Sequence, residues 1–112
     1  MFVGRTVLDA GGDCIGQVST LYLDLDTGVV AFAGVAMIRR GRRRIVFVPL
    51  RGATLRPASI TVACGKLLAR RAVSVRPGQS LPVGAAADLF AHYDLPYVPP
   101  EPIGGRRLVP YI

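Results

Sequence analysis

The stretch of this sequence whose residue types could do chemistry is Asp26-Thr27-Gly28, which follows an apolar run. In aspartic proteases such a tripeptide supplies one of two facing aspartates, which share a proton because adjacent carboxylates cannot both ionise. The chain contains one copy, so a site of this kind would need a symmetric dimer with Asp26 on its axis. The alternative is structural, because Asp and Gly are typical turn residues between two strands. We favour the turn, since the residues after Gly28 run directly into an apolar segment.

Other candidate chemistry is sparse. Asp24 and Asp26 are not followed by the acidic ligands of a calcium loop. Cys14 and Cys64 are too far apart for a Cys-x-x-Cys metal or redox site. His92, the single histidine, belongs to no recognised nucleophile motif, and the sequence lacks the common phosphate-loop, dinucleotide and zinc-protease motifs. We therefore expect no catalytic residues, no cofactor and no metal.

Positive charge is the strongest signal in the composition. The chain has 14 Lys and Arg against 7 Asp and Glu, a net charge of +7. Its densest cluster supplies the candidate partner-binding residues, which are Arg39, Arg40, Arg42, Arg43 and Arg44. Arginine pairs bidentately with carboxylate and phosphate, so an acidic protein or a nucleic acid could bind here. A solvated hairpin tip is the alternative that we favour, and the absence of interleaved aromatics argues against stacking of a single strand.

The elements that would position these residues are mostly strands. The 112 residues form one domain, with strands expected at 2–8, 15–25, 29–38, 45–48, 54–56 and 60–62. Residues 29–38 are apolar at both parities, so both faces of that strand should be covered. This spacing predicts a mainly β fold, as a small barrel or sandwich. No apolar run reaches about 18 residues and no secretory signal opens the chain, so we expect a cytoplasmic protein without a membrane span.

The C-terminal part differs in composition. Residues 66–72 could form a helical turn, residues 85–93 are the best helix candidate, and the proline-rich tail that follows should be extended. Helix and tail together could cover the barrel or anchor a homodimer, since tyrosine is common at interfaces. The candidate dimer-interface residues are Tyr93, Leu95, Tyr97, Val109 and Tyr111.

Residues 4–64 resemble the PRC-barrel family. The features that carry the resemblance are Gly4-Arg5, the Gly12-Asp13 turn with Ile15-Gly16 after it, Leu21-Tyr22-Leu23-Asp24, Asp26-Thr27-Gly28, and an arginine-rich hairpin entering Val46-Phe47-Val48-Pro49. That family includes the cytoplasmic domain of the photosynthetic reaction-centre H subunit, the C-terminal domain of a ribosome-maturation factor, and small stand-alone bacterial proteins. Residues 92–97 also resemble the C-terminal tails of those stand-alone proteins. The resemblance implies a small, highly curved antiparallel β-barrel that serves protein interaction and performs no chemistry.

Two units are therefore expected. Residues 1–80 would form a PRC-barrel-like β-domain, and residues 81–112 a short helix and proline-rich tail packed on the barrel or on a partner. The expected function is a non-enzymatic protein-interaction module that self-associates as a homodimer. The alternative is an RNA- or ribosome-associated factor that binds through the hairpin at residues 39–44. Neither the identity of the partner nor the biological process follows from the sequence.

Overall fold

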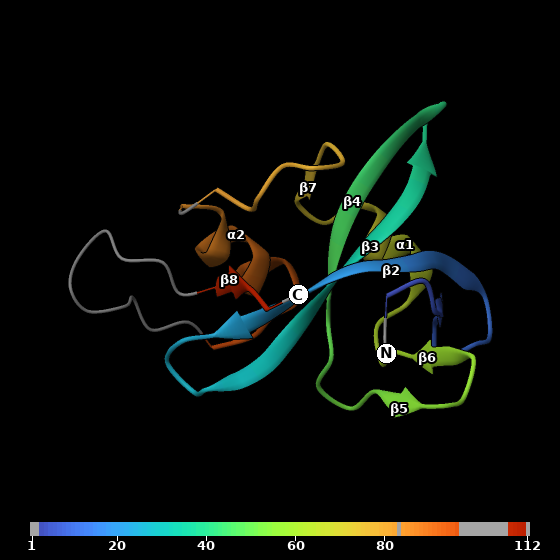
Figure 1. The fold of residues 1–112 in the computed structure, drawn as a ribbon, viewed down its shortest axis with the longest axis horizontal. Coiled ribbons are helices and arrows are strands. Elements are labelled where there is room, and N and C mark those ends of the chain that lie inside the picture. The colour runs from blue at the N-terminus through green and yellow to red at the C-terminus, as the bar shows by residue number, and fades with distance from the viewer. Residues whose placement is uncertain (1–2, 83, 97–107, 112) are drawn as a thin grey trace.

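The computed structural model describes residues 3–82, 84–96 and 108–111. Four strands come first along the chain: β1 (Thr6–Leu8), β2 (Cys14–Asp24), β3 (Val29–Arg39) and β4 (Arg42–Pro49). They are followed by β5 (Thr54–Leu55), β6 (Ser59–Thr61), α1 (Lys66–Arg70), β7 (Ser74–Val75), α2 (Ala85–His92) and β8 (Leu108–Pro110). The expected mainly β fold with a short C-terminal helix is confirmed (Figure 1).

All the described strands belong to one sheet. Its order is β5-β6-β1-β2-β3-β4-β7, and β8 pairs with β2. Every pairing is antiparallel except that of β1 with β6. The long strands β2, β3 and β4 twist strongly, and the β2–β3 and β3–β4 turns lie at the two ends of β3 (Figure 1). Within the described part of the chain, hydrogen bonds do not join β5 to β7, so the sheet is curved but not closed.

The sheet has a hydrophobic core on each face. One core lies among β1, β2, β3, β4, β6 and α1, and its members include Val7, Ile15, Val18, Val35, Val46, Ile60 and Ala69. The other lies under α2 and β8, and its members include Tyr22, Phe32, Phe47, Leu81, Leu89, Phe90 and Leu108. Neighbouring residues of β3 enter different cores, as Phe32 and Ala33 do. The prediction that both faces of this strand are covered is therefore confirmed.

The second core is built within one chain. Leu89 and Phe90 of α2 are buried against the sheet, and Leu108 of β8 is buried beside them. The Leu81 N–H donates to the Tyr22 hydroxyl at 3.1 Å, which fixes the segment before α2. From the sequence, the helix and tail could either cover the barrel or anchor a homodimer. The chain itself supplies that cover, so the dimer stays a prediction without this support.

Strands β2 and β3 approach each other closely at one point. A Cβ atom added to Gly16 would lie 2.1 Å from the Ala36 carbonyl oxygen, so only glycine fits there. The pairing of these strands shifts register between Val18 and Thr20, which marks a β-bulge or a similar irregularity. Val18 and Leu21, which lie on either side of this shift, both belong to the first core.

Two features differ from the expectations. The strands expected at residues 29–38 and 45–48 are longer, because β3 extends to Arg39 and β4 begins at Arg42. Strand β7 was not expected. The described end of the tail is extended, as predicted, and forms strand β8 on β2. Among the residues described here, no helix has the length and apolar character needed to cross a membrane.

Candidate functional site

The Asp-Thr-Gly tripeptide lies at the tip of the β2–β3 hairpin, as predicted. Asp24 pairs with Val29, and the Gly28 N–H donates to the Asp24 carbonyl at 2.8 Å. The buried Asp24 carboxylate accepts the Asp26 N–H at 2.9 Å, which is the pattern of an Asx turn. Gly28 has a φ of 72°, a conformation that glycine adopts without strain. These contacts account for the tripeptide as a turn.

Metal-ligating side chains do not gather within residues 3–82, 84–96 and 108–111. No group of three or more His, Cys, Asp or Glu side chains there could hold a metal ion. Cys14 and Cys64 are free thiols, and desolvation raises the pKa of the Cys64 thiol. His92 donates its Nε2–H to the Leu68 carbonyl at 2.7 Å. The single histidine therefore links α2 to α1.

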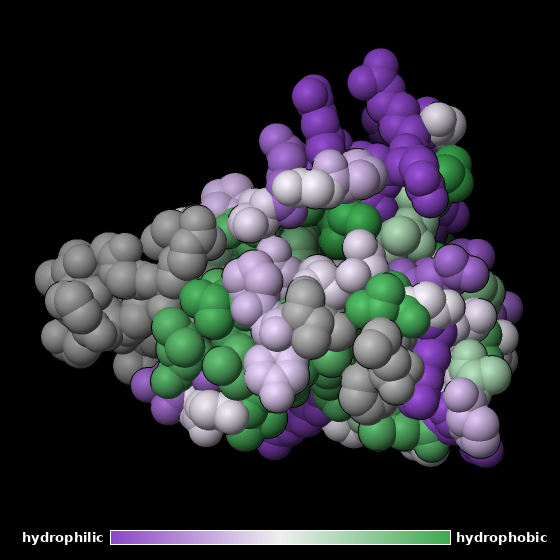
Figure 2. Space-filling view, viewed as in Figure 1, coloured by the Kyte–Doolittle hydropathy of each residue, from purple (hydrophilic) through white to green (hydrophobic). Residues whose placement is uncertain are grey.

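The β3–β4 hairpin divides the five candidate arginines into two groups. Its turn consists of Arg40 and Gly41, whose φ values of 53° and 75° are both positive, as a two-residue type I′ turn requires. Arg40, Arg42 and Arg43 are exposed, whereas Arg39 and Arg44 are half-buried and bound within the chain. Hydrophilic side chains project from this end of the molecule (Figure 2). The cluster is thus only partly a solvated tip.

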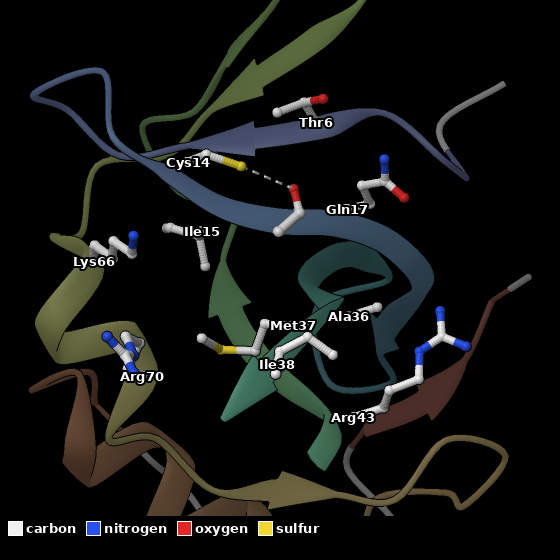
Figure 3. A pocket seen from close by; sticks show the side chains of 11 residues that line it. Thr6, Cys14, Ile15, Gln17, Ala36, Met37, Ile38, Arg43, Lys66 and Arg70 are labelled. Atoms are coloured by element: carbon white, nitrogen blue, oxygen red, sulfur yellow. Dashed lines mark hydrogen bonds between the residues drawn. The ribbon is translucent and has the colours of Figure 1, made fainter. Parts of the chain in front are cut away.

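A groove of about 400 Å³ with cationic side chains runs beside this hairpin. Lys66 and Arg70 enter it from α1, and Arg43 lies on the opposite side (Figure 3). We call this feature the basic groove. The other residues that line it are Thr6, Cys14, Ile15, Gly16, Gln17, Ala36, Met37 and Ile38. No carboxylate is among the described residues of its lining, so an anion would meet three cations there without competition.

Contacts at both ends hold α1 in place. At its start, the Asp9 carboxylate accepts the Lys66 N–H at 3.0 Å. The same carboxylate accepts the N–H groups of Gly11 and Asp13, each at 2.9 Å. Because these bonds favour the ionised form, the Asp13 contact first and the Lys66 contact next, the pKa of Asp9 is lowered. At the end of α1, Arg39 Nη1 donates to the Arg70 carbonyl at 2.6 Å. The backbone that carries Lys66 and Arg70 is therefore fixed.

The candidate dimer-interface residues have different environments. Tyr93 donates its hydroxyl to the Phe47 carbonyl at 2.6 Å, and burial raises the pKa of this phenol. Leu95 packs against the second core, and Val109 is half-buried where it pairs with Leu23. Tyr111 is 59% exposed, and Tyr97 lies outside the described residues. Of the described candidates, Tyr111 has the most surface to offer a partner.

Sequence reasoning found one of the three groove cations. Arg43 belonged to the predicted cluster, whereas Lys66 and Arg70 were not among the candidate residues. The spacing of Lys66 and Arg70, four residues apart, places both on one side of a helix and was a usable signal. No local pattern could indicate that Arg43 lies opposite them.

Comparison of the chain with protein-family models, with curated proteins and with solved structures gives no match. A function for this chain is therefore inferred from the groove, the hairpin and the residues around them.

Proposed function

We propose that this protein is a non-enzymatic protein-interaction module of the PRC-barrel type, which holds an acidic segment of a partner protein in the basic groove. The observation that carries the proposal is that Arg43, Lys66 and Arg70 all line one groove, with no carboxylate among its described lining residues. Such a field attracts a negatively charged partner and orients its approach.

The lining of the groove favours a polypeptide over a nucleic acid. Ile15, Met37 and Ile38 contribute aliphatic surface to the lining, and its described residues include no aromatic side chain on which a base could stack. An aliphatic side chain of the partner can therefore lie between two acidic ones. The partner segment that fits best alternates acidic and aliphatic residues.

The backbone on one side of the groove is also preorganised for binding. Asp9 holds the start of α1, and Arg39 holds its end. Because the backbone beneath Lys66 and Arg70 is already fixed, little conformational freedom is lost there when a partner binds.

The sequence resemblance of residues 4–64 supports the same function, since PRC-barrel domains are interaction modules. Self-association is part of the proposal, with Tyr111 as the described candidate that is most exposed. Binding of RNA by the exposed tip residues Arg40 and Arg42 is the competing outcome in the experiment below.

Fluorescence anisotropy with three labelled probes tests the proposal. The probes are a short peptide that alternates Glu and Leu, an acidic peptide of equal charge without aliphatic residues, and a single-stranded RNA of similar length. We expect the alternating peptide to bind most tightly and Arg70→Gln to weaken it. The matched control is Arg76→Gln, an exposed arginine outside the groove lining. Tighter binding of RNA than of the alternating peptide would contradict the proposal. Equal losses of peptide affinity in the two variants would contradict it as well.

A further inference from the structure

The side chains of Arg39 and Arg44 converge on the hydroxyl group of Ser74. Arg39 Nη2 donates to Ser74 Oγ at 3.0 Å, and Arg44 donates to the same oxygen from Nε at 3.2 Å and from Nη2 at 3.0 Å. Arg44 Nη2 also reaches the Ser74 carbonyl at 3.3 Å. We call this group of three side chains the two-arginine clamp. Its two guanidinium groups both reach one oxygen, so a single tetrahedral oxyanion could contact both.

The clamp carries two positive charges that are not neutralised. Among the described residues, no carboxylate pairs with Arg39 or Arg44; their partners are the Ser74 oxygens and the Arg70 carbonyl. Both side chains are half-buried, so water screens their mutual repulsion less than it would at a fully exposed site. A neutral hydroxyl is also a weaker acceptor for guanidinium than an oxyanion is. An anion in this place would therefore gain attraction from both cations.

Ser74 adds a donor at the centre of the clamp. Its Oγ is the acceptor in each hydrogen bond that it makes with Arg39 and Arg44. Its own hydroxyl proton has no acceptor within the described part of the chain, and a hydroxyl can donate one hydrogen bond while accepting others. An anion would thus be met by guanidinium N–H groups and by one O–H group.

The geometry of the clamp is fixed before any ligand arrives. Arg39 and Arg44 lie on the two strands of one tight hairpin, and Ser74 is held on β7 by its pairing with Val46 of β4. Fixed donors lose little conformational freedom on binding, which favours affinity for a small ligand.

We propose that the two-arginine clamp binds a phosphate monoester dianion, independently of the basic groove. Two guanidinium groups match two negative charges, and the planar fork of each can reach a pair of phosphate oxygens. A carboxylate has one charge and two oxygens, so it satisfies only one fork. Binding is non-covalent, and the ligand displaces part of the arginine contact with Ser74. Inorganic phosphate and the phosphate group of a small ester share this chemistry.

NMR titration of the full chain, labelled with ¹⁵N, tests the proposal. The ligands are inorganic phosphate, adenosine 5′-monophosphate and acetate, each at constant ionic strength. We expect saturable shifts of the Arg39 and Arg44 Nε–H signals with phosphate, and binding of acetate that is weaker by about tenfold or more. Tighter binding of the nucleotide would identify an ester as the ligand, and equal or weaker binding would identify free phosphate. Equal affinity for acetate and phosphate would overturn the proposal.

Three variants separate the clamp from general positive charge. Arg44→Lys keeps the charge but loses the fork and should weaken phosphate binding about tenfold. Arg42→Lys, on the exposed part of the same hairpin, is the matched control and should leave binding unchanged. An equal loss of phosphate affinity in both variants would show that the general positive charge of the hairpin attracts phosphate, and would refute the clamp. Should Arg44→Lys fail to fold, Ser74→Ala decides, because it keeps both arginines; it should weaken binding several-fold, and unchanged binding would refute the clamp.

Lys66→Gln makes the two sites distinguishable. This variant removes a cation of the basic groove, while the clamp contacts involve other side chains. Lys66→Gln should lower the affinity for the acidic peptide and leave the affinity for phosphate unchanged. A loss of phosphate affinity equal to that in Arg44→Lys would place the phosphate in the groove and refute the clamp, whatever the peptide does.

Discussion

The Asp9 carboxylate and the Lys66 backbone N–H form a 3.0 Å hydrogen bond between residues that are 57 positions apart. It joins the turn after β1 to the first residue of α1, the helix that supplies two cations to the basic groove. The acidic side chain at the start of α1 is also electrostatically favourable there. Asp9 is therefore expected to act on binding through the position of α1 and not through contact with the partner.

Replacing Asp9 by Asn tests this positioning role. The amide keeps a single oxygen acceptor, and its NH₂ group would face one of the N–H donors that now point at a carboxylate. We expect Asp9→Asn to lower the melting temperature, measured by calorimetry. We also expect it to lower the affinity for the acidic peptide, measured by fluorescence anisotropy. Asp88→Asn, in the first turn of α2, is the matched control. Unchanged peptide affinity in a destabilised Asp9→Asn protein would show that the contact serves stability alone.

The same carboxylate predicts a pH dependence. Its pKa in the folded protein lies below the ordinary value of 3.8, so the unfolded chain binds the proton more readily. The stabilisation is thus fully present above that ordinary pKa and is lost as pH falls through the lower, folded value. The free energies of unfolding of the wild type and Asp9→Asn, measured with urea, should differ at pH 7. This difference should shrink below about pH 4. A constant difference down to pH 2 would argue against ionisation as the cause.

Gly16 should tolerate no side chain. The Cβ of Gly16→Ala would lie 2.1 Å from the Ala36 carbonyl oxygen, so β2 and β3 would have to separate. We expect the free energy of unfolding to fall by roughly 1–3 kcal/mol, as for other overpacked sites. Gly84→Ala is the control, because nothing lies within 4 Å of its Cβ position and its φ is −75°. Equal urea midpoints for the two variants would contradict the close approach.

The substitution Asp26→Asn should preserve the turn. Its backbone N–H, not its carboxylate, makes the Asx-turn contact with Asp24, and this contact survives Asp26→Asn. We expect a change in unfolding free energy below about 1 kcal/mol, as for an exposed polar position. Asp24→Ala, which removes the buried acceptor, should lower the free energy of unfolding by more than Asp26→Asn does. Pepstatin-sensitive proteolysis that disappears in Asp26→Asn would restore the protease alternative.

The parts of the fold that could be predicted depend on local information. The Asp26-Thr27-Gly28 turn follows from residue types within a few positions, and the double-sided cover of residues 29–38 follows from their continuous apolar character. Strand β7 could not be predicted, because Ser74 and Val75 form a strand only where β4 offers them an edge.

The candidate sites depend on contacts between distant segments. The arginine cluster is visible in the sequence, but its division into exposed and bound members depends on Ser74, which lies 35 residues from Arg39. Likewise, the sequence contains Lys66 and Arg70 without indicating that Arg43 lies opposite them. Local patterns identify which residues could bind an anion, whereas the topology decides which of them act together.

The homodimer is the last prediction, and Tyr111 is its sharpest test. This side chain is 59% exposed and follows directly on β8, whereas the hydroxyl of Tyr93 is already bound to Phe47 within the chain. If Tyr111 lies in an interface, Tyr111→Ser should shift the light-scattering mass from about twice 11.9 kDa toward 11.9 kDa at micromolar concentrations. Leu67→Ser, at a side chain that is 68% exposed on α1, is the matched control and should leave the mass unchanged. A wild-type mass near 11.9 kDa throughout that range would mean that the chain is a monomer, and the cover that α2 and β8 give the second face of the sheet would then be all that its apolar surface requires.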